Sequence, residues 1–519
     1  MSDFDEHCRK LTEQFLQTAV VVDDEAFMGQ PETDIGALSA PTRRRSSSTG
    51  DESDVPPRGR HSLDANAIIN SFAGLGIICG MVGPEGEAAE PVIRQADIVV
   101  LDWQLRGDDG ERTLDLMTRL LKEESARNAL RLVAVYTGED RLDDIQHAIV
   151  ERLGKDGLDP VPVKGVLSYG HATVVLYAKH GVLVGPEWKE RRVSEEDLPS
   201  RLVSDFSAVT IGLLPGVALV SLTAVRESTH VVLDRFRADL DPAFLAHRTC
   251  LANPDEAEEQ MVASIASELR SVMDDAVANQ EPAGREPIAQ WIGDRKNVTG
   301  SFQFGEKTLN FDETVKIATQ GLGETTNSNR RFFENNLECL SAGFGGGDGD
   351  ALDERLAWIM ASRTILGRLR PKLWLGTVVR RTSEGTNDGE ELICLRPRCD
   401  SVRLDGSTSF GFLRLGEPKK GQEQLVVGSS EGYRRRGIQW DASGWRIYSF
   451  DPSTETNAVL AQRDATTGKL AFKDACGATY EWLGELKAEF AQRMATAFAN
   501  HLSRPAIDDS EWLRRSARK

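Results

Sequence analysis

The sequence predicts an α/β fold for its first 200 residues, with a doubly wound sheet of five parallel strands. A helical region and a β-rich carboxyl-terminal region with a closing helix are predicted to follow. Three observations carry this prediction. Short apolar runs alternate with helical patterns up to about residue 200, helical periodicity dominates to about residue 278, and short β-type runs recur between about 373 and 474.

The five predicted strands are apolar runs of the kind that is buried on both faces of a parallel sheet. In chain order they are 19–22, 77–82, 98–101, 132–136 and 173–177. Apolar residues spaced three or four apart predict helices between them, within 67–75, 114–121 and 142–153. Residues 1–17 are expected to form a short charged helix rather than an export signal.

Residues 29–62 interrupt this alternation. They contain four prolines and a run of arginines and serines without an apolar period, so we expect a disordered insertion. The predicted domains are 1–200 including that insertion, a mainly helical region 201–342, and an α+β domain 351–519. A glycine-rich flexible joint is predicted at 343–349.

Two further segments of the carboxyl half carry a specific expectation. The closing helix is predicted to place five large apolar residues on one face: Trp482, Leu486, Phe490, Met494 and Phe498. The basic run 434–436 is predicted to lie in a solvated hairpin rather than on nucleic acid.

Composition excludes several classes of protein. The chain has 519 residues with a formal net charge of −19, which argues against a protein that coats nucleic acid or binds an anionic membrane surface. Its seven cysteines are scattered, so a reducing cytoplasm is expected instead of a disulfide framework. Residues 208–225 carry no charge, but Pro215 and Gly216 interrupt them. We therefore expect a buried helix pair with a turn at Pro215-Gly216 rather than a transmembrane span.

Polar residues follow four of the five predicted strands. Asp23 and Asp24 follow the first strand, Asp102 the third, Thr137 the fourth and Lys179 the fifth. The carboxyl ends of neighbouring parallel strands meet at one edge of a sheet, so these side chains are expected to converge.

These residue types suit the transfer of a phosphoryl group to a carboxylate. A carboxylate can attack phosphorus, Mg²⁺ takes oxygen ligands, and a lysine neutralises phosphoryl oxygens. Asp24 and Asp102 fit as direct metal ligands, with Asp23 as a second or water-mediated one. Taken separately, the aspartates could cap a turn or helix, Lys179 could be a surface charge, and Thr137 a hydroxyl at a strand end.

Together the motifs resemble the receiver domain of bacterial response regulators, over about residues 18–200. The matching segments are 20–25, 97–103, 109–110, 134–138 and 178–179. The resemblance implies the strand order 2-1-3-4-5. It also implies the following roles: Asp102 as phosphoacceptor, Mg²⁺ held by Asp23, Asp24, Asp102 and the backbone carbonyl of Gln104, Thr137 as switch hydroxyl and Lys179 as phosphate partner.

The sequence departs from the family pattern near Lys179. His180 stands where the family has proline, and the aromatic expected three positions before the lysine is Leu176, with Tyr177 one place later. These departures concern the family's aromatic–threonine switch. The interval from Thr137 to Lys179 is also long, which leaves room for an additional strand or hairpin at 161–170.

The resulting hypothesis is a cytoplasmic phosphorelay protein that accepts a phosphoryl group on Asp102 from a sensor histidine kinase or phosphotransfer protein. Its output is an unknown downstream protein and not DNA, or else it acts as a phosphate sink. A looser similarity, carried by 392–404, is to large atypical bacterial response receiver proteins, some of which belong to anti-phage systems. No enzyme activity is expected beyond Mg²⁺-dependent phosphorylation and dephosphorylation of Asp102 itself. The alternatives are a receiver-regulated enzyme with an unrecognised carboxyl-terminal active site, and a phosphate-independent scaffold.

Overall fold

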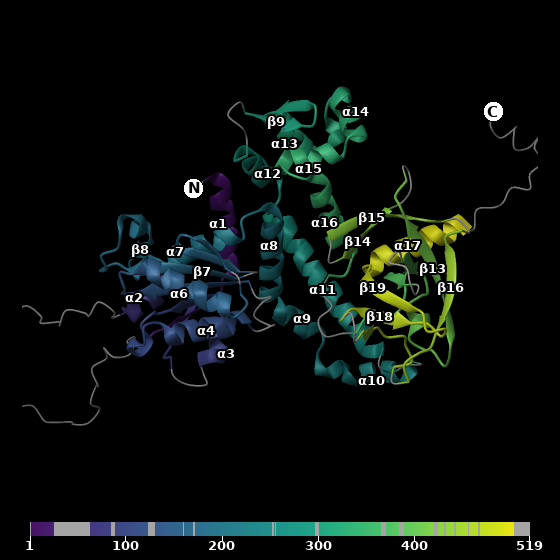
Figure 1. Cartoon of the computed structure of the whole chain (residues 1–519), viewed down its shortest axis with the longest axis horizontal. Coiled ribbons are helices and arrows are strands. Elements are labelled where there is room, and N and C mark those ends of the chain that lie inside the picture. Colours follow the sequence, from purple (N-terminus) through teal and green to yellow (C-terminus); the bar gives the residue numbers. More distant parts are fainter. Residues whose placement is uncertain are drawn as a thin grey trace, which may run out of the picture. The chain divides into compact units, whose positions relative to one another are not determined.

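The computed structural model forms two compact units, Met1–Arg295 and Lys296–Lys519 (Figure 1). It describes these residues: 2–24, 63–84, 89–122, 130–158, 160–169, 172–251, 254, 256–295, 300–364, 370–382, 389–419, 424–429, 432–440, 443–454, 456–464 and 468–502. The predicted disordered insertion 29–62 lies outside the described residues. The division into three domains with boundaries near 200 and 342–351 stays a prediction.

The first unit is built on an eight-stranded sheet with the order β2-β1-β3-β4-β7-β6-β5, and β8 also pairs with β7. The strands are β1 (Thr18–Val22), β2 (Ile78–Val82), β3 (Ile98–Leu101), β4 (Arg131–Thr137), β5 (Val161–Val163), β6 (Val166–Tyr169), β7 (Ala172–Lys179) and β8 (Arg192–Val193). Strands β2, β1, β3, β4 and β7 are parallel neighbours. They are the five predicted strands in the predicted order 2-1-3-4-5.

Two additions extend the sheet beyond β7. The antiparallel hairpin β5–β6 pairs with the first half of β7, and the short β8 runs parallel to its last two residues. The hairpin lies within residues 161–170, where the long interval between Thr137 and Lys179 predicted an additional strand or hairpin.

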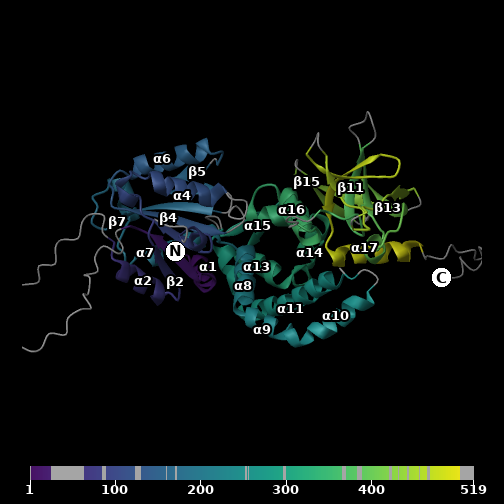
Figure 2. The ribbon, with the colours of Figure 1, turned by 90° about the horizontal axis from the view of Figure 1, so that it is seen from below.

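Helices cover both faces of this sheet, which makes it doubly wound. Figure 2 shows α4 (Glu111–Lys122) and α6 (Leu142–Lys155) on one side, and α2 (Ala65–Gly74) and α7 (Leu198–Val209) on the other. Along β1, Val20 and Val22 enter the core under α4 and α6, whereas Ala19 and Val21 enter the core under α2 and α7. Because successive residues of a strand point to opposite faces, a strand buried on both faces is apolar throughout.

The helices before and after the sheet pack against each other. The charged amino-terminal helix, α1 (Asp3–Phe15), is present as expected and begins with a capping box between Ser2 and Asp5. It packs on α7 and on α8 (Leu213–Glu227). A Cβ on Gly216 of α8 would lie 3.2 Å from Leu11, so a small residue allows α8 to approach α1 closely.

The uncharged stretch 208–225 is bent, but not where expected. α7 and α8 meet at an angle of 119° across residues 210–212, and Pro215 lies inside the first turn of α8. Proline is tolerated there because the first N–H groups of a helix have no partner within the helix. In the described part of the chain, no single helix is long and apolar enough to cross a membrane, although the bent pair passes that test jointly.

The first unit ends in four helices and one of them is long. They are α9 (Thr229–Arg235), α10 (Asp241–Cys250), α11 (Glu256–Gln280) and α12 (Arg285–Gly293). α11 packs along α8 and α10. This segment is mainly helical, as the sequence predicts.

The second unit opens with a hairpin and four helices. They are β9 (Ser301–Phe304), β10 (Lys307–Asn310), α13 (Phe311–Gln320), α14 (Asn327–Asn335), α15 (Glu338–Gly345) and α16 (Gly349–Ala361). The glycine-rich segment predicted as a flexible joint is instead the packed end of α15, a short turn and the start of α16. Gly343 lies so close to the Phe304 ring that a Cβ would overlap it. Gly343, and Gly349 against Ala342, therefore permit close packing.

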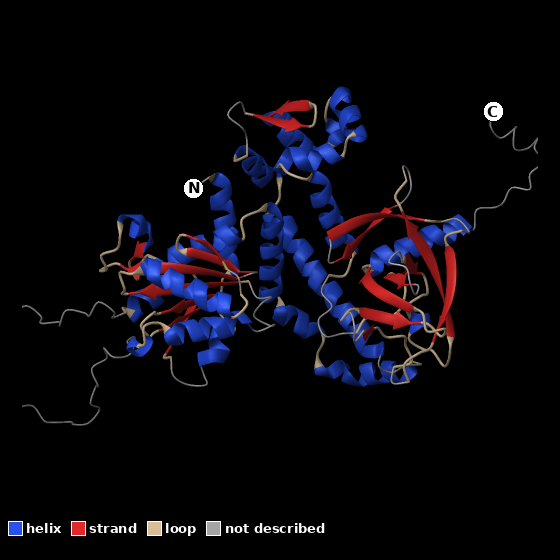
Figure 3. Ribbon diagram, viewed as in Figure 1, coloured by secondary structure: helices blue, strands red, loops and turns tan. Residues whose placement is uncertain are grey.

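The rest of the second unit is an antiparallel sheet of nine strands with the order β14-β15-β13-β12-β11-β19-β18-β17, and β16 beside β13 (Figure 3). The elements are β11 (Thr377–Thr382), β12 (Glu390–Cys394), β13 (Thr408–Gly416), β14 (Gln424–Ser429), β15 (Gly432–Ile438), β16 (Trp445–Phe450), β17 (Gln462–Arg463), β18 (Leu470–Lys473), β19 (Thr479–Glu485) and α17 (Ala488–Leu502). This is the predicted β-rich region, and α17 is the predicted closing helix. The helix begins at Ala488, so two of the five predicted residues lie outside it: Trp482 belongs to β19, and Leu486 lies between β19 and α17.

Candidate functional site

The carboxyl edge of the parallel sheet gathers the predicted site residues. Asp23 directly follows β1, Asp102 directly follows β3, and Thr137 and Lys179 are the last residues of β4 and β7. All four side chains are buried, with exposed fractions of 2% for Asp23, 5% for Asp102, 0% for Thr137 and 3% for Lys179. Charged groups are rarely buried this deeply unless they are paired.

The ammonium of Lys179 lies between two carboxylates. Its Nζ is 3.2 Å from Oδ1 of Asp102 and 3.6 Å from Oδ2 of Asp23. The ring of Tyr136 lies 5.8 Å from the same nitrogen. When all three groups are ionised, one positive charge faces two negative charges at this edge. The cluster is therefore suited to accept further positive charge.

The loop after β3 holds the Asp102 carboxylate and main chain in place. The backbone N–H of Gln104 donates to Oδ2 of Asp102 at 2.8 Å, and the Thr113 hydroxyl donates to the Asp102 carbonyl oxygen at 2.6 Å. Gly110, with a φ of 89°, packs against the Trp103 ring so closely that a Cβ would lie 2.2 Å from it. Only glycine fits this position without rearrangement, which accounts for Gly110 of the Asp109-Gly110 pair.

Burial dominates the protonation of Asp102. It raises the pKa of this carboxyl from 3.8 to about 6, because removal from water disfavours the charged form. The Lys179 ammonium opposes this shift, and the Asp23 carboxylate adds to it. Asp102 is therefore mainly ionised at pH 7, but less completely than an exposed aspartate.

Asp24 and Gln104, the other two predicted metal ligands, lie at the rim of the cluster. Oδ2 of Asp24 accepts a hydrogen bond from the Arg106 N–H at 2.8 Å, so this half-buried carboxylate is tied to the loop after β3. The Gln104 carbonyl accepts from the Gly107 N–H at 3.3 Å. Each of these groups keeps a further oxygen lone pair for another ligand.

The donor set fits a hydrated Mg²⁺. In the described residues no group of three aspartate, glutamate, histidine or cysteine side chains is arranged to hold a metal ion. Mg²⁺ needs no such group, since it keeps several waters and takes one or two carboxylates. Oδ1 of Asp102 is buried and faces the Lys179 ammonium at 3.2 Å. That oxygen and the Asp23 carboxylate, which both face the Lys179 ammonium, would hold the ion.

The Thr137 hydroxyl is linked to the loop after β4. It accepts a hydrogen bond from the Glu139 N–H at 3.0 Å, and the Glu139 carboxylate accepts from Nε2 of Gln104 at 3.1 Å. This link between the two loops was not predicted. Glu139 directly follows the Thr137-Gly138 motif and carries no sequence signal of its own.

The tyrosines beside the site are held by the elements that follow β7. The Tyr177 hydroxyl donates to Oδ2 of Asp205 in α7 at 2.5 Å, with the Arg191 guanidinium 5.0 Å from the tyrosine ring. The Tyr136 hydroxyl donates to the Val193 carbonyl of β8 at 3.0 Å. Burial raises the pKa of the Asp205 carboxyl, while the tyrosine hydrogen bond lowers it. Tyr177 is thus fixed on the α7 face of the sheet.

Leu176, at the position where the family pattern has an aromatic residue, lies in the opposite core under α4 and α6. Neither it nor Tyr177 provides a mobile ring in the usual place. The departure at Leu176 and Tyr177 therefore places the aromatic ring of β7 on the α7 face of the sheet, and Leu176 on the α4 and α6 face.

Comparison with protein families agrees with this geometry. Residues 15–181 match the model of a family described as the response receiver domain. The matched segment contains every predicted site residue, and the chain thus carries a response receiver domain within a larger protein. Receiver domains in general serve phosphorelay signalling and bind Mg²⁺ for phosphorylation. A comparison with curated proteins gives no match.

Proposed function

We propose that the receiver domain accepts a phosphoryl group on Asp102 from the phosphohistidine of a sensor histidine kinase or phosphotransfer protein. The observation that carries the proposal is the position of the Lys179 ammonium, 3.2 Å from Asp102 and 3.6 Å from Asp23 in a buried cluster. A structural ion pair would need one carboxylate, whereas a phosphoryl site benefits from two around a lysine and a metal ion.

The transfer balances with these groups. A carboxylate oxygen of Asp102 attacks phosphorus, the phosphorus–nitrogen bond of the donor breaks, and the departing imidazole takes up a proton. The product is an acyl phosphate on Asp102. Lys179 neutralises a phosphoryl oxygen, and the Thr137 hydroxyl donates a hydrogen bond to another. Mg²⁺, held by Asp23, Asp24, Asp102 and the Gln104 carbonyl, would supply further positive charge against the phosphoryl oxygens.

The contact between β7 and α7 favours an output over a passive phosphate sink. Tyr177, two residues before Lys179, donates to Asp205, and the cation of Arg191 lies 3.6 Å from the same carboxylate. A shift of Lys179 would therefore move Tyr177 and its partner Asp205, and so change the position of α7, which packs on α1. We infer that a downstream protein in the cytoplasm recognises this helical surface, and hydrogen exchange in α7 with and without beryllofluoride tests that route. Equal protection of α7 in both states would favour the sink.

Phosphorylation with a small donor tests the acceptor assignment. The full chain is incubated with Mg²⁺ and acetyl phosphate, and incorporation is compared among wild type, Asp102→Asn and Asp109→Asn. Asp109 is the matched control, because it lies in the same loop with its side chain 71% exposed. We expect label in wild type and in Asp109→Asn, and none in Asp102→Asn. Equal labelling of all three proteins would refute the assignment.

A further inference from the structure

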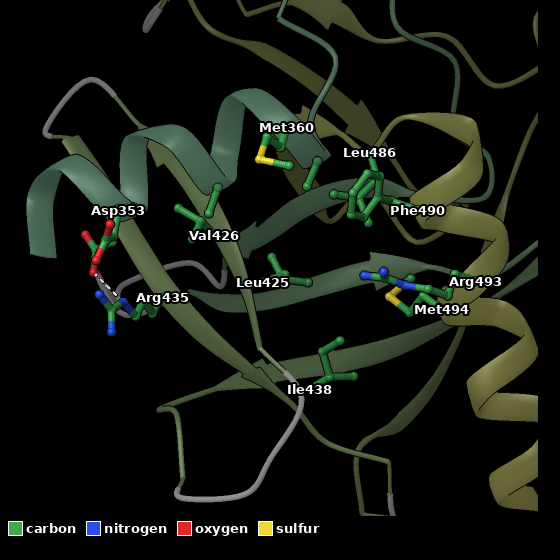
Figure 4. Close-up of a pocket in the computed structure, with 13 residues that line it drawn as sticks. Asp353, Met360, Leu425, Val426, Arg435, Ile438, Leu486, Phe490, Arg493 and Met494 are labelled. Atoms are coloured by element: carbon green, nitrogen blue, oxygen red, sulfur yellow. Dashed lines mark ion pairs between the residues drawn. The ribbon is translucent and has the colours of Figure 1, made fainter. Parts of the chain in front are cut away.

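The second unit contains a cavity that lies outside the receiver domain. Its volume is about 500 Å³, and it lies between α16, the β14–β15 hairpin and the start of α17 (Figure 4). That volume is within the usual range for small-molecule sites, roughly 300–1,000 Å³. The cavity is therefore large enough for an organic ligand.

Apolar side chains form the floor and both long walls of the cavity. Leu425 and Ile438 come from the hairpin strands, Leu486 and Met494 from the segment around α17, and Met360 from α16. Leu486 and Met494 are buried, whereas Met360 is 57% exposed. A solvent-facing methionine at the rim of an apolar hollow can adapt to a bound apolar group.

The charged groups at one end of the cavity are already satisfied. Glu354 of α16 pairs with Arg435 of β15 at 3.2 Å, and Arg435 also pairs with Asp350 at 2.8 Å. Asp353 accepts a hydrogen bond from the Ser341 hydroxyl at 2.5 Å. A ligand that approached this end would find no charge in need of a partner.

The α17 side of the cavity carries a positive charge, that of Arg493. Figure 4 shows Arg493 extending from α17 toward Leu425. Its guanidinium stacks on the Phe490 ring at 4.8 Å, and no carboxylate of a described residue lies within ion-pair distance of it. A guanidinium presents a planar fork of donors that matches a carboxylate. The cavity thus combines an apolar floor with one positively charged recognition group.

We propose that this cavity binds an amphipathic monocarboxylate, with its apolar body on Leu425 and Met494 and its carboxylate paired to Arg493. The argument rests on charge complementarity and size. Arg493 is exposed, so a neutral apolar molecule would gain nothing from the guanidinium and a cation would be repelled by it. The inference is independent of the function proposed for the receiver domain.

Calorimetric titration of the full chain tests this site with three ligands that share one chain length: decanoate, decanol and decylamine, each below its aggregation concentration. Arg493→Gln is compared with Gln492→Glu. Both variants lower the net charge by one unit, at adjacent and exposed positions of α17. We expect decanoate to bind more tightly than decanol or decylamine. Arg493→Gln should weaken decanoate about ten- to hundredfold, the usual range for a hydrogen bond to a charged group, and Gln492→Glu should bind as wild type does.

A second measurement locates the ligand in the wild-type protein and needs no variant. Decanoate should increase hydrogen-exchange protection in α16, β14 and α17 and leave the receiver strands unchanged. Three results would overturn the proposal: no decanoate binding, decanoate and decanol of equal affinity, or equal losses in Arg493→Gln and Gln492→Glu. Hydrogen-exchange protection by decanoate outside the second unit would also overturn the proposal.

Discussion

Replacing Asp102 by asparagine should stabilise the receiver domain at neutral pH, although it removes the proposed phosphoacceptor. The Asp102 carboxylate is buried, and its pKa is raised from 3.8 to about 6. Its charged form therefore costs stability, despite the ion pair with Lys179. Asparagine stays neutral and keeps an oxygen that can accept the Gln104 N–H. Lys179 keeps its contact with Asp23, at 3.6 Å.

The size and pH dependence of the effect follow from linkage. A pKa shift from 3.8 to about 6, at about 1.4 kcal/mol per unit, corresponds to about 3 kcal/mol. Below pH 3.8 the aspartate is protonated in both states and the difference vanishes. Between 3.8 and about 6 the unfolded state ionises first, so wild type loses stability relative to the variant. The full difference is present above about pH 6, and about half of it at pH 5.

Urea unfolding of the full chain, resolved by pulsed hydrogen exchange of β3 and β4 peptides, measures this difference in metal-free buffer. Asp109→Asn is the control and should change stability by less than about 0.5 kcal/mol, as surface substitutions usually do. The reasoning would be refuted if Asp102→Asn were no more stable than wild type at pH 7.5. A difference that did not shrink between pH 7.5 and pH 5 would also refute it.

Three further predictions concern the site and its surroundings. With limiting Mg²⁺, phosphorylation by acetyl phosphate should speed up as pH rises through about 6, because the attacking Asp102 must be ionised. Saturating Mg²⁺ should move the midpoint of this rate increase to lower pH. A midpoint that Mg²⁺ leaves unchanged would contradict the prediction. Asp23→Asn should weaken Mg²⁺ binding in a calorimetric titration and lower the pKa of Asp102, since the Asp23 carboxylate raises it; unchanged affinity would remove Asp23 from the ligand set. Tyr177→Phe should cost about 1–3 kcal/mol of stability, because the half-buried Asp205 carboxylate loses its tyrosine hydrogen bond and keeps the Arg191 ion pair. The labelling rate of Asp102 should stay unchanged, and slower labelling would show that this contact also acts on the acceptor site.

The framework of the first unit could be predicted because its signals are local. The parallel strands β1, β3, β4 and β7 are buried on both faces, so their apolar runs are visible in the sequence. The edge strand β2 is also apolar, but it is only partly buried. The chemistry-bearing residues stand where those runs end, and the fold brings parallel ends together. The juxtaposition of Asp102 and Lys179 follows from these two facts, although 77 positions separate them. Their roles in phosphoryl transfer stay a prediction.

The remaining features depend on contacts that the sequence does not encode locally. Trp482 and Leu486 are four residues apart, a spacing that suits one face of a helix and equally one face of a strand, so the helix start was placed too early. The glycine-rich segment 343–349 indicates a flexible joint until the Phe304 ring that packs on Gly343 is known. The hydrogen bond between Tyr177 and Asp205 likewise joins β7 to α7 through tertiary packing, and no sequence pattern predicts it.

Chemical mapping of the phosphorylated residue in wild type tests the central claim most directly. The full chain is phosphorylated with Mg²⁺ and acetyl phosphate, reduced with borohydride and digested, so that an aspartyl phosphate becomes homoserine that tandem mass spectrometry can locate. The account predicts homoserine at position 102, beside Trp103. Homoserine at another aspartate, or a phosphoryl group retained on a serine or histidine with position 102 unchanged, would contradict it.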